Sequence, residues 1–177
     1  MPLLPDPSKI YIKHTIYETK KTSGVEPYFY TLFSGLGLVS EMLYSSITKI
    51  DIHKEDDPDP LPITSYVSSC VITVYEYNSV LDRFFPEEEN VEFSGPGTYS
   101  EVFFNDPECK DNLFPPTRVP VEVMAKITLI IKQIWDMGYS VNDIHAGNFV
   151  INSEGIVKMI DFELISARNP TKILKRQ

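Results

Sequence analysis

The 177-residue sequence is poor in cysteine, in long apolar runs and in positive charge. Its two cysteines, Cys70 and Cys109, are widely separated, which excludes a disulfide scaffold or a zinc knuckle as the organising principle. No stretch approaches the roughly 18 consecutive apolar residues of a membrane-spanning helix, and the N-terminus lacks the pattern of a signal peptide. These absences predict an intracellular protein in a reducing compartment, without a membrane span.

The charge balance narrows the classes of partner. The formal net charge is −9, whereas nucleic-acid and membrane-surface binders need a basic face to contact phosphates. We therefore expect no nucleic-acid partner. With 42% hydrophobic and 23% charged residues, the chain has enough apolar side chains for one domain, or for two small lobes that share a cleft.

The N-terminal half combines strand patterns with a long helical pattern. Residues 9–18 are rich in β-branched and aromatic side chains and predict a strand. Residues 27–50 place apolar side chains at helical spacing and predict a helix. Two glycines weaken this helix and are candidates for a kink or a split. Residues 63–77 predict strand again, and the region is long enough for two strands with a break near Ser68 and Ser69.

The middle of the chain is less regular. Residues 79–85 predict a short helical turn, and residues 86–118 form a long connection that contains several prolines and glycines. Within this connection, residues 91–94 and 99–104 are candidates for the two arms of a hairpin. A structureless connection of this length is uncommon inside a compact domain.

The C-terminal part carries the clearest patterns. Behind Pro120, apolar side chains recur at i, i+3, i+4 and i+7 and predict a core-facing helix that Gly138 ends. The segments 149–151 and 156–160 flank an Asn-Ser-Glu-Gly turn and predict a β-hairpin. Asp161 follows directly at the exit of this hairpin.

Three polar residues surround the predicted hairpin: Asp143 and Asn148 precede it, and Asp161 follows it. Because a hairpin folds the chain back on itself, the loop before it and the residue after it become neighbours. Two carboxylates and an amide at one point suit phosphoryl transfer, in which one carboxylate receives a proton and the other groups hold Mg²⁺. The alternative is that all three residues cap turns and face water.

The same segment resembles the catalytic loop and metal-binding motif of the protein-kinase-like superfamily. Asp143 and Asn148 match the D-x-x-x-x-N of the catalytic loop, and Asp161-Phe162 match the first two residues of D-F-G. The form D-x-H-x-x-N, with His145, is similar to that of aminoglycoside, lipopolysaccharide and several viral kinases. The resemblance implies that Asp143 is the catalytic base and that Asn148 and Asp161 bind Mg²⁺ and ATP.

The N-terminal half is similar to the nucleotide-binding lobe of the same superfamily. The tetrapeptide that ends at Lys13 resembles V-A-I-K, which implies that Lys13 binds phosphates with a glutamate partner, either Glu41 or Glu26. The stretch that holds Glu76 and Tyr77 resembles the hinge strand, whose backbone binds adenine.

Several departures accompany these matches. Val141-Asn142-Asp143 stands in place of H-R-D, Glu163 replaces the glycine of D-F-G, and no glycine-rich loop precedes Lys13. The stretch SGPGTYSEVFF at 94–104 fits a glycine-rich pattern by letter, but it follows the hinge. The resemblance implies an α+β, truncated bilobal kinase-like fold, viral or bacterial-effector in type. Residues 9–78 would form a reduced N-lobe and hinge, and residues 79–177 a truncated, helical C-lobe with the catalytic-loop hairpin.

Three functional interpretations stay open. The first is an ATP- and Mg²⁺-dependent phosphotransferase that acts on a hydroxyl, with a Ser or Thr of a protein substrate as the expected acceptor. The second is a pseudokinase that serves as a binding module for a partner protein. The third is a fragment that another segment or subunit completes. His145 also has three candidate roles: it orients the loop, binds a substrate phosphate or bonds a backbone carbonyl.

Overall fold

The computed structural model describes residues 10–38, 41–52, 63–73, 78–86, 97–162 and 164–168. The chain divides into two compact units, Met1–Tyr75 (unit 1) and Glu76–Gln177 (unit 2). Both units combine helices with antiparallel strands, which confirms the predicted α+β class. Within the described ranges, every helix is too short or too polar to cross a lipid bilayer.

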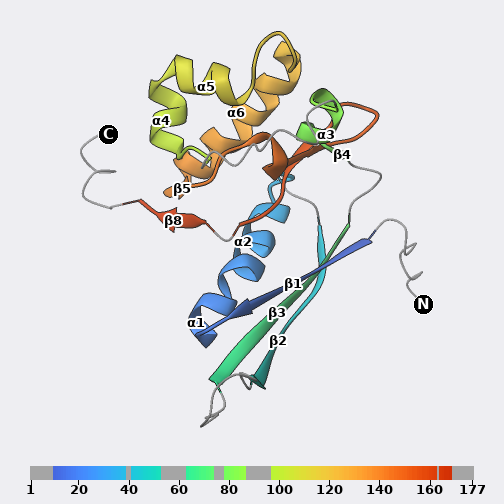
Figure 1. Cartoon of the computed structure of the whole chain (residues 1–177), viewed down its shortest axis with the longest axis vertical. Helices are drawn as coiled ribbons and strands as arrows, with labels where there is room; N and C mark the ends of the chain where they lie inside the picture. Colours follow the sequence, from blue (N-terminus) through green and yellow to red (C-terminus); the bar gives the residue numbers. More distant parts are fainter. Residues whose placement is uncertain are drawn as a thin grey trace, which may run out of the picture. The chain divides into compact units, whose positions relative to one another are not determined.

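Unit 1 is a three-stranded antiparallel sheet with two helices alongside it (Figure 1). The strands are β1 (Ile10–Tyr17), β2 (Met42–Ile52) and β3 (Ile63–Thr73), and β3 lies in the centre. The helices α1 (Lys20–Ser23) and α2 (Val25–Ser34) follow β1 directly. Strand β1 confirms the strand that the sequence predicts over residues 9–18.

Helix α2 packs on the sheet through side chains at helical spacing. Its buried positions are Glu26, Phe29, Tyr30 and Phe33, the stripe that one face of an α-helix presents. Phe29 and Phe33 stack with their ring centroids 5.4 Å apart. The core of unit 1 thus comes mainly from aromatic residues of α2.

The predicted helix over residues 27–50 is wrong beyond Ser34. Helix α2 ends before Gly35, and Gly37 has a positive φ of 69°, a conformation that glycine adopts easily. Strand β2 begins at Met42, and its β-branched side chains fit the sheet. The predicted break in the third strand is also absent, because Ser68 and Ser69 pair with neighbouring strands on both sides.

The helices of unit 2 include two that the sequence did not predict. Helix α3 (Val80–Phe84) confirms the expected helical turn, and α6 (Val121–Asp136) confirms the core-facing helix. Helices α4 (Ser100–Asn105) and α5 (Pro107–Leu113) lie in the connection that was expected to be irregular. Residues 99–104 are therefore helical rather than one arm of a hairpin, and the other proposed arm, 91–94, lies outside the described residues.

The start of α5 shows why the sequence was misinterpreted there. Asp106 is the N-cap, and its Oδ1 accepts hydrogen bonds from the backbone N–H groups of Glu108 and Cys109. Pro107 occupies the first helical turn, where its missing N–H costs nothing. Pro107 is one of the prolines on which the irregular connection was predicted, whereas together with Asp106 it begins a helix.

The strands of unit 2 form two small antiparallel sheets. Strands β4 (Asn78–Ser79), β6 (Phe149–Ile151) and β7 (Val157–Met159) make the first, with β6 in the centre. Strands β5 (Tyr139–Val141) and β8 (Ile165–Ala167) make the second. The β6–β7 pair confirms the predicted hairpin, in which Asn152 Oδ1 accepts from the N–H groups of Glu154 and Ile156.

The core of unit 2 lies between α6 and the hairpin. Gly138, with a φ of 96°, ends the helix region as predicted. The buried side chains are aliphatic along α6 and include aromatic rings from α4, the end of α5 and the hairpin: Val123, Ile127, Ile130, Ile131, Ile134, Phe103, Phe114, Phe149 and Met159. The hairpin that flanks the candidate site is thus anchored on a continuous apolar layer.

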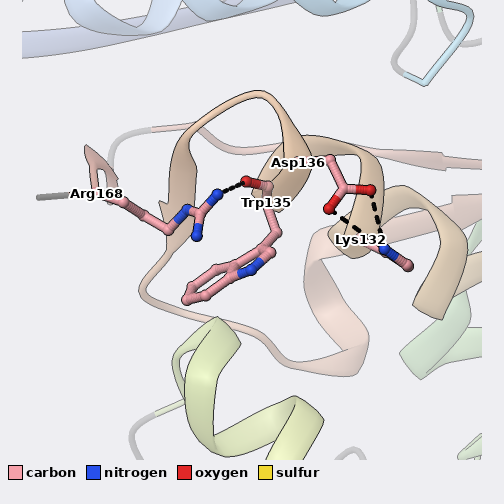
Figure 2. A network of polar contacts seen from close by, with 4 residues as sticks. All are labelled: Lys132, Trp135, Asp136 and Arg168. Atoms are coloured by element: carbon pink, nitrogen blue, oxygen red, sulfur yellow. Dashed lines mark hydrogen bonds and ion pairs between the residues drawn. The ribbon is translucent and has the colours of Figure 1, made fainter. Parts of the chain in front are cut away.

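Arg168 fastens the end of β8 to the end of α6 (Figure 2). Its guanidinium carbon lies 4.0 Å from the centroid of the Trp135 ring, and Nη2 donates a hydrogen bond to the Trp135 carbonyl oxygen. Its backbone N–H donates to Gly138 O at 2.8 Å. A cation at a helix C-terminus also interacts favourably with the helix dipole. The end of β8 is therefore held against the end of α6.

Candidate active site

Asp143, Asn148 and Asp161 line one pocket in unit 2, together with Val141 and Leu164. The pocket has a volume of about 60 Å³, and one water needs about 10–15 Å³ on this measure. The pocket has room for a few water-sized ligands, such as a cation with its waters or a phosphate oxygen. The structure thus brings the three polar residues selected from the sequence to one place.

Asp143 follows β5 in a loop that is fixed by the neighbouring strand. Asn142 N–H donates to Leu164 O at 2.9 Å, and Asn142 Nδ2 donates to Ser166 Oγ at 2.9 Å. These bonds continue the β5–β8 pairing up to the residue before Asp143. The Asp143 side chain itself is 31% exposed, so its carboxylate is accessible to a reactant.

His145 contacts the carboxylate of Asp143. Its Nε2 lies 3.3 Å from Asp143 Oδ2, while its Nδ1 accepts the N–H of Gly147 at 3.1 Å. Because Nδ1 is an acceptor, the neutral ring carries its proton on Nε2, which then faces Asp143. The expected bond to a backbone carbonyl is replaced by a bond to a backbone amide, and the contact with Asp143 supports a role in orienting the loop.

Asn148 connects the two sides of the pocket. Its side chain is buried, and Nδ2 donates to the backbone oxygen of Asp143 at 2.6 Å. Its own backbone oxygen accepts the N–H of Ile160, the residue before Asp161, at 2.8 Å. Since Nδ2 is used to hold the loop, Oδ1 is the amide atom that remains for a ligand in the pocket.

Asp161 stands at the exit of β7 in an unusual backbone conformation. It is the non-glycine residue with a positive φ, 70°, among the described residues. Such a conformation is uncommon outside glycine and clusters at functional sites, where surrounding structure enforces it. The next residue, Phe162, is fully buried. The buried ring and the Ile160 hydrogen bond hold Asp161 from both sides.

The chemistry of this site suits a cation that arrives with phosphate. Among the described residues, no group of three or more His, Cys, Asp or Glu side chains is arranged to hold a metal. Mg²⁺, however, commonly binds through one or two carboxylates plus substrate phosphates and waters. Asn148 Oδ1 and Asp161 fit that incomplete set of ligands.

Unit 1 contains a buried ion pair at the predicted phosphate-binding lysine. Lys13 Nζ lies 2.8 Å from Glu26 Oε1, and the side chains are 21% and 1% exposed. Of the two glutamates that the sequence left open as partners of Lys13, Glu26 is the one that pairs with it. Glu41 is exposed and precedes β2 rather than lying on a helix, and its backbone oxygen accepts the N–H of Thr73. The other alternative, Glu41, lies outside a helix because α2 ends at Ser34.

Cys70 lies opposite Lys13 on the central strand. Burial raises the pKa of the Cys70 thiol, and the Glu26 carboxylate raises it further. This cysteine is therefore a neutral core residue.

The remaining predicted site residues, Glu76 and Tyr77, lie outside the described residues, as does Glu163. Sequence reasoning also missed a segment that contacts the Asp143 loop. Residues 97–100 lie beside the Asp143 loop: Thr98 and Ile144 exchange backbone hydrogen bonds of 3.2 and 2.7 Å, and Ser100 Oγ bonds both N and O of Val141. The one feature of the sequence that marks this segment is the Gly-Pro-Gly-Thr stretch, which does not indicate which residues the segment contacts.

Comparisons with known proteins found structural but no sequence relatives. No family model and no curated protein matches the chain. Among solved structures, the yeast RNA polymerase II CTD kinase CTDK-1 complex matches with a TM-score of 0.43 and 15% identity, over 90% of this chain and 40% of that chain. The bifunctional kinase-methyltransferase WbdD matches with a TM-score of 0.44 and 11% identity, over 95% of this chain and 31% of that one. The chain therefore spans less than half the length of either structure.

Proposed function

We propose that this protein is an ATP-dependent phosphotransferase of the protein-kinase-like type, which transfers the γ-phosphate to a hydroxyl. The single observation that carries the proposal is the convergence of Asp143, Asn148 and Asp161 on one pocket, with Asn148 joining the two sides. The expected acceptor is a Ser or Thr hydroxyl of a protein. The same residue types and spacing serve phosphoryl transfer in protein kinases.

Asp143 is assigned as the general base. As the acceptor oxygen forms its bond to the γ-phosphorus, the bond from that phosphorus to the ADP oxygen breaks, and Asp143 accepts the proton of the acceptor hydroxyl. The partial exposure of Asp143 supports this role, because the hydroxyl must reach the carboxylate. His145 Nε2, 3.3 Å from Oδ2, restricts the rotation of the carboxylate.

Asn148 and Asp161 are assigned as ligands of Mg²⁺, which would neutralise charge on the nucleotide phosphates. Asn148 is suited to this role because its Nδ2 is held by Asp143 O and its Oδ1 has a fixed direction. Asp161 is suited because its strained backbone and its buried neighbour Phe162 leave its carboxylate little freedom.

Lys13 is assigned to the nucleotide phosphates. The buried Glu26 carboxylate holds the ammonium group of Lys13 in place. The ammonium group thus offers a positive charge at a fixed position, as phosphate binding requires. This assignment rests on the chemistry of the pair within unit 1.

Calorimetric titration with ATP, with and without Mg²⁺, tests the nucleotide part of the proposal. We expect binding that depends on Mg²⁺, and a loss of at least tenfold in affinity in Asp161→Asn. Asp136→Asn is the matched control, because Asp136 is exposed on α6 and pairs only with Lys132 in the described structure (Figure 2). Equal binding with and without Mg²⁺ by the wild type would contradict the assignment of Asn148 and Asp161.

A binding module without turnover is the second candidate. It is favoured by Val141 and Asn142, which stand in place of the His and Arg of H-R-D. In that case Mg²⁺–ATP binds as above, but no phosphate is transferred. A stable partner protein would then be expected, and Asp143→Asn would leave partner binding unchanged.

A further inference from the structure

We propose that residues 97–100, here named the clamp, position the Asp143 carboxylate, and that Gly97 is a positioning residue for the proposed reaction. This inference rests on the proposed function for its effect on turnover. The predicted effect on the position of the Asp143 carboxylate depends on the structure alone.

The clamp lies along the Asp143 loop on both sides of the aspartate. After Asp143, Thr98 N–H donates to Ile144 O at 3.2 Å and Ile144 N–H donates to Thr98 O at 2.7 Å. Before Asp143, Ser100 Oγ accepts the N–H of Val141 at 2.9 Å and donates to Val141 O at 3.3 Å. Thr98 and Ser100 are both buried. The backbone of the loop is thus fixed two residues before and one residue after the proposed base.

Gly97 lies against Asp143 itself. A Cβ atom at position 97 would lie 2.3 Å from Asp143 Oδ1, 2.9 Å from the Asp143 carbonyl carbon and 3.0 Å from Ile144 N. The side-chain oxygen is the atom that can move most easily, because the other two belong to the backbone. Any larger residue at position 97 therefore displaces the carboxylate first.

The expected displacement is large enough to affect catalysis. Ordinary van der Waals contact begins near 3.4 Å, so Oδ1 at 2.3 Å from the added Cβ has to move by about 1 Å. A misplacement of about 1 Å of a reacting group can lower a rate by about 100-fold. Rotation of the carboxylate also disturbs the 3.3 Å contact between Oδ2 and His145 Nε2. The Asp143 carboxylate thus has His145 Nε2 at one oxygen and Gly97 beside the other.

The first test compares steady-state kinetics of the full-length wild type, Gly97→Ala and Gly35→Ala. Gly35→Ala is the matched control, because a Cβ at Gly35 meets nothing closer than Leu32 O at 3.9 Å. We expect Gly97→Ala to lower kcat by about 10- to 100-fold, with the KM for ATP changed by less than about twofold, since the metal ligands are untouched. An unchanged kcat would overturn the inference. An increased kcat would also overturn it, and would show instead that the clamp blocks the acceptor.

The second test is independent of turnover and uses NMR of the same variants. We expect Gly97→Ala to shift the side-chain carboxyl carbon of Asp143 and the ring Nε2 of His145, and Gly35→Ala to leave both in place. If the wild type transfers no phosphate, the proposed function fails while this test still decides the inference. Unshifted Asp143 and His145 resonances in Gly97→Ala would overturn it.

A variant without steric overlap covers the case in which Gly97→Ala does not fold. Ser100→Ala removes both side-chain bonds to Val141 and adds no atoms. We expect the Val141 amide hydrogen to exchange at least tenfold faster, with a smaller fall in kcat than in Gly97→Ala. Unaltered exchange at Val141 would contradict the role of the clamp.

Discussion

Replacing Lys13 by methionine tests the buried ion pair of unit 1. The substitution keeps most of the apolar stem but removes the ammonium group, 2.8 Å from Oε1 of a Glu26 side chain that is 1% exposed. Removing one partner of a buried pair typically costs about 3–5 kcal/mol, because the other charge stays buried. Lys13 is 21% exposed, so we expect the lower end, a loss of about 3 kcal/mol in the free energy of unfolding of unit 1.

A substitution of the other partner, Glu26, has a smaller predicted effect. Glu26→Gln keeps the shape of the side chain and leaves the ammonium of Lys13, which is exposed enough to reach water. We expect a loss of about 1.5 kcal/mol, the lower end of the range for a hydrogen bond that involves a charged group. The order of the two variants therefore follows from the unequal burial of the partners.

The assay must report on unit 1 specifically. Trp135 is the single tryptophan and lies in unit 2, so its fluorescence serves as an internal control. Amide hydrogen exchange of the central strand β3 under increasing urea gives the free energy of unfolding of unit 1. Lys49→Met, at an exposed site on β2, is the matched control. A loss below about 1 kcal/mol in Lys13→Met, or one equal to that of Lys49→Met, would refute the reasoning.

Three further predictions concern stability. The folded state raises the pKa of the Cys70 thiol. The contribution of the neutral thiol to stability is therefore complete below about pH 8.5, the pKa of an unperturbed cysteine, and is lost as the pH rises above that value. Urea unfolding from pH 7 to 10 should show this loss in the wild type but not in Cys70→Ala. Arg168→Leu should destabilise unit 2 by about 1–2 kcal/mol and alter the emission of Trp135, and Arg168→Lys should restore less than half of that loss. Asn148→Ala should speed exchange in the Asp143 loop and cost about 1–2 kcal/mol, and a protein as stable as the wild type in urea would contradict the hydrogen bond to Asp143 O.

The parts of the fold that were predicted correctly are those with a strong local pattern. Helix α6 has a regular apolar stripe between Pro120 and Gly138, and the β6–β7 hairpin has a turn sequence between two short apolar runs. Because these two elements fix where the chain reverses, the meeting of Asp143, Asn148 and Asp161 in one pocket followed from local sequence.

The parts that were missed depend on contacts between distant residues or on a boundary. The helical pattern of α2 continues by chance into β2, and only Gly35 and Gly37 mark the boundary. The choice of Glu26 as the partner of Lys13 depended on that boundary. The approach of Gly97 to Asp143, 46 positions along the chain, leaves no periodicity in the sequence, because it arises from two loops that meet side by side.

Phosphate transfer by the wild type and by Asp143→Asn tests the central claim most directly. The full chain is incubated with Mg²⁺ and γ-labelled ATP, with itself and generic proteins as acceptors, and the label on Ser and Thr is quantified. The account predicts transfer by the wild type and by the control Asp136→Asn, and a rate about 10²–10⁴-fold lower in Asp143→Asn, the usual contribution of a general base. Absence of transfer by the wild type, or an equal rate in Asp143→Asn, would contradict it.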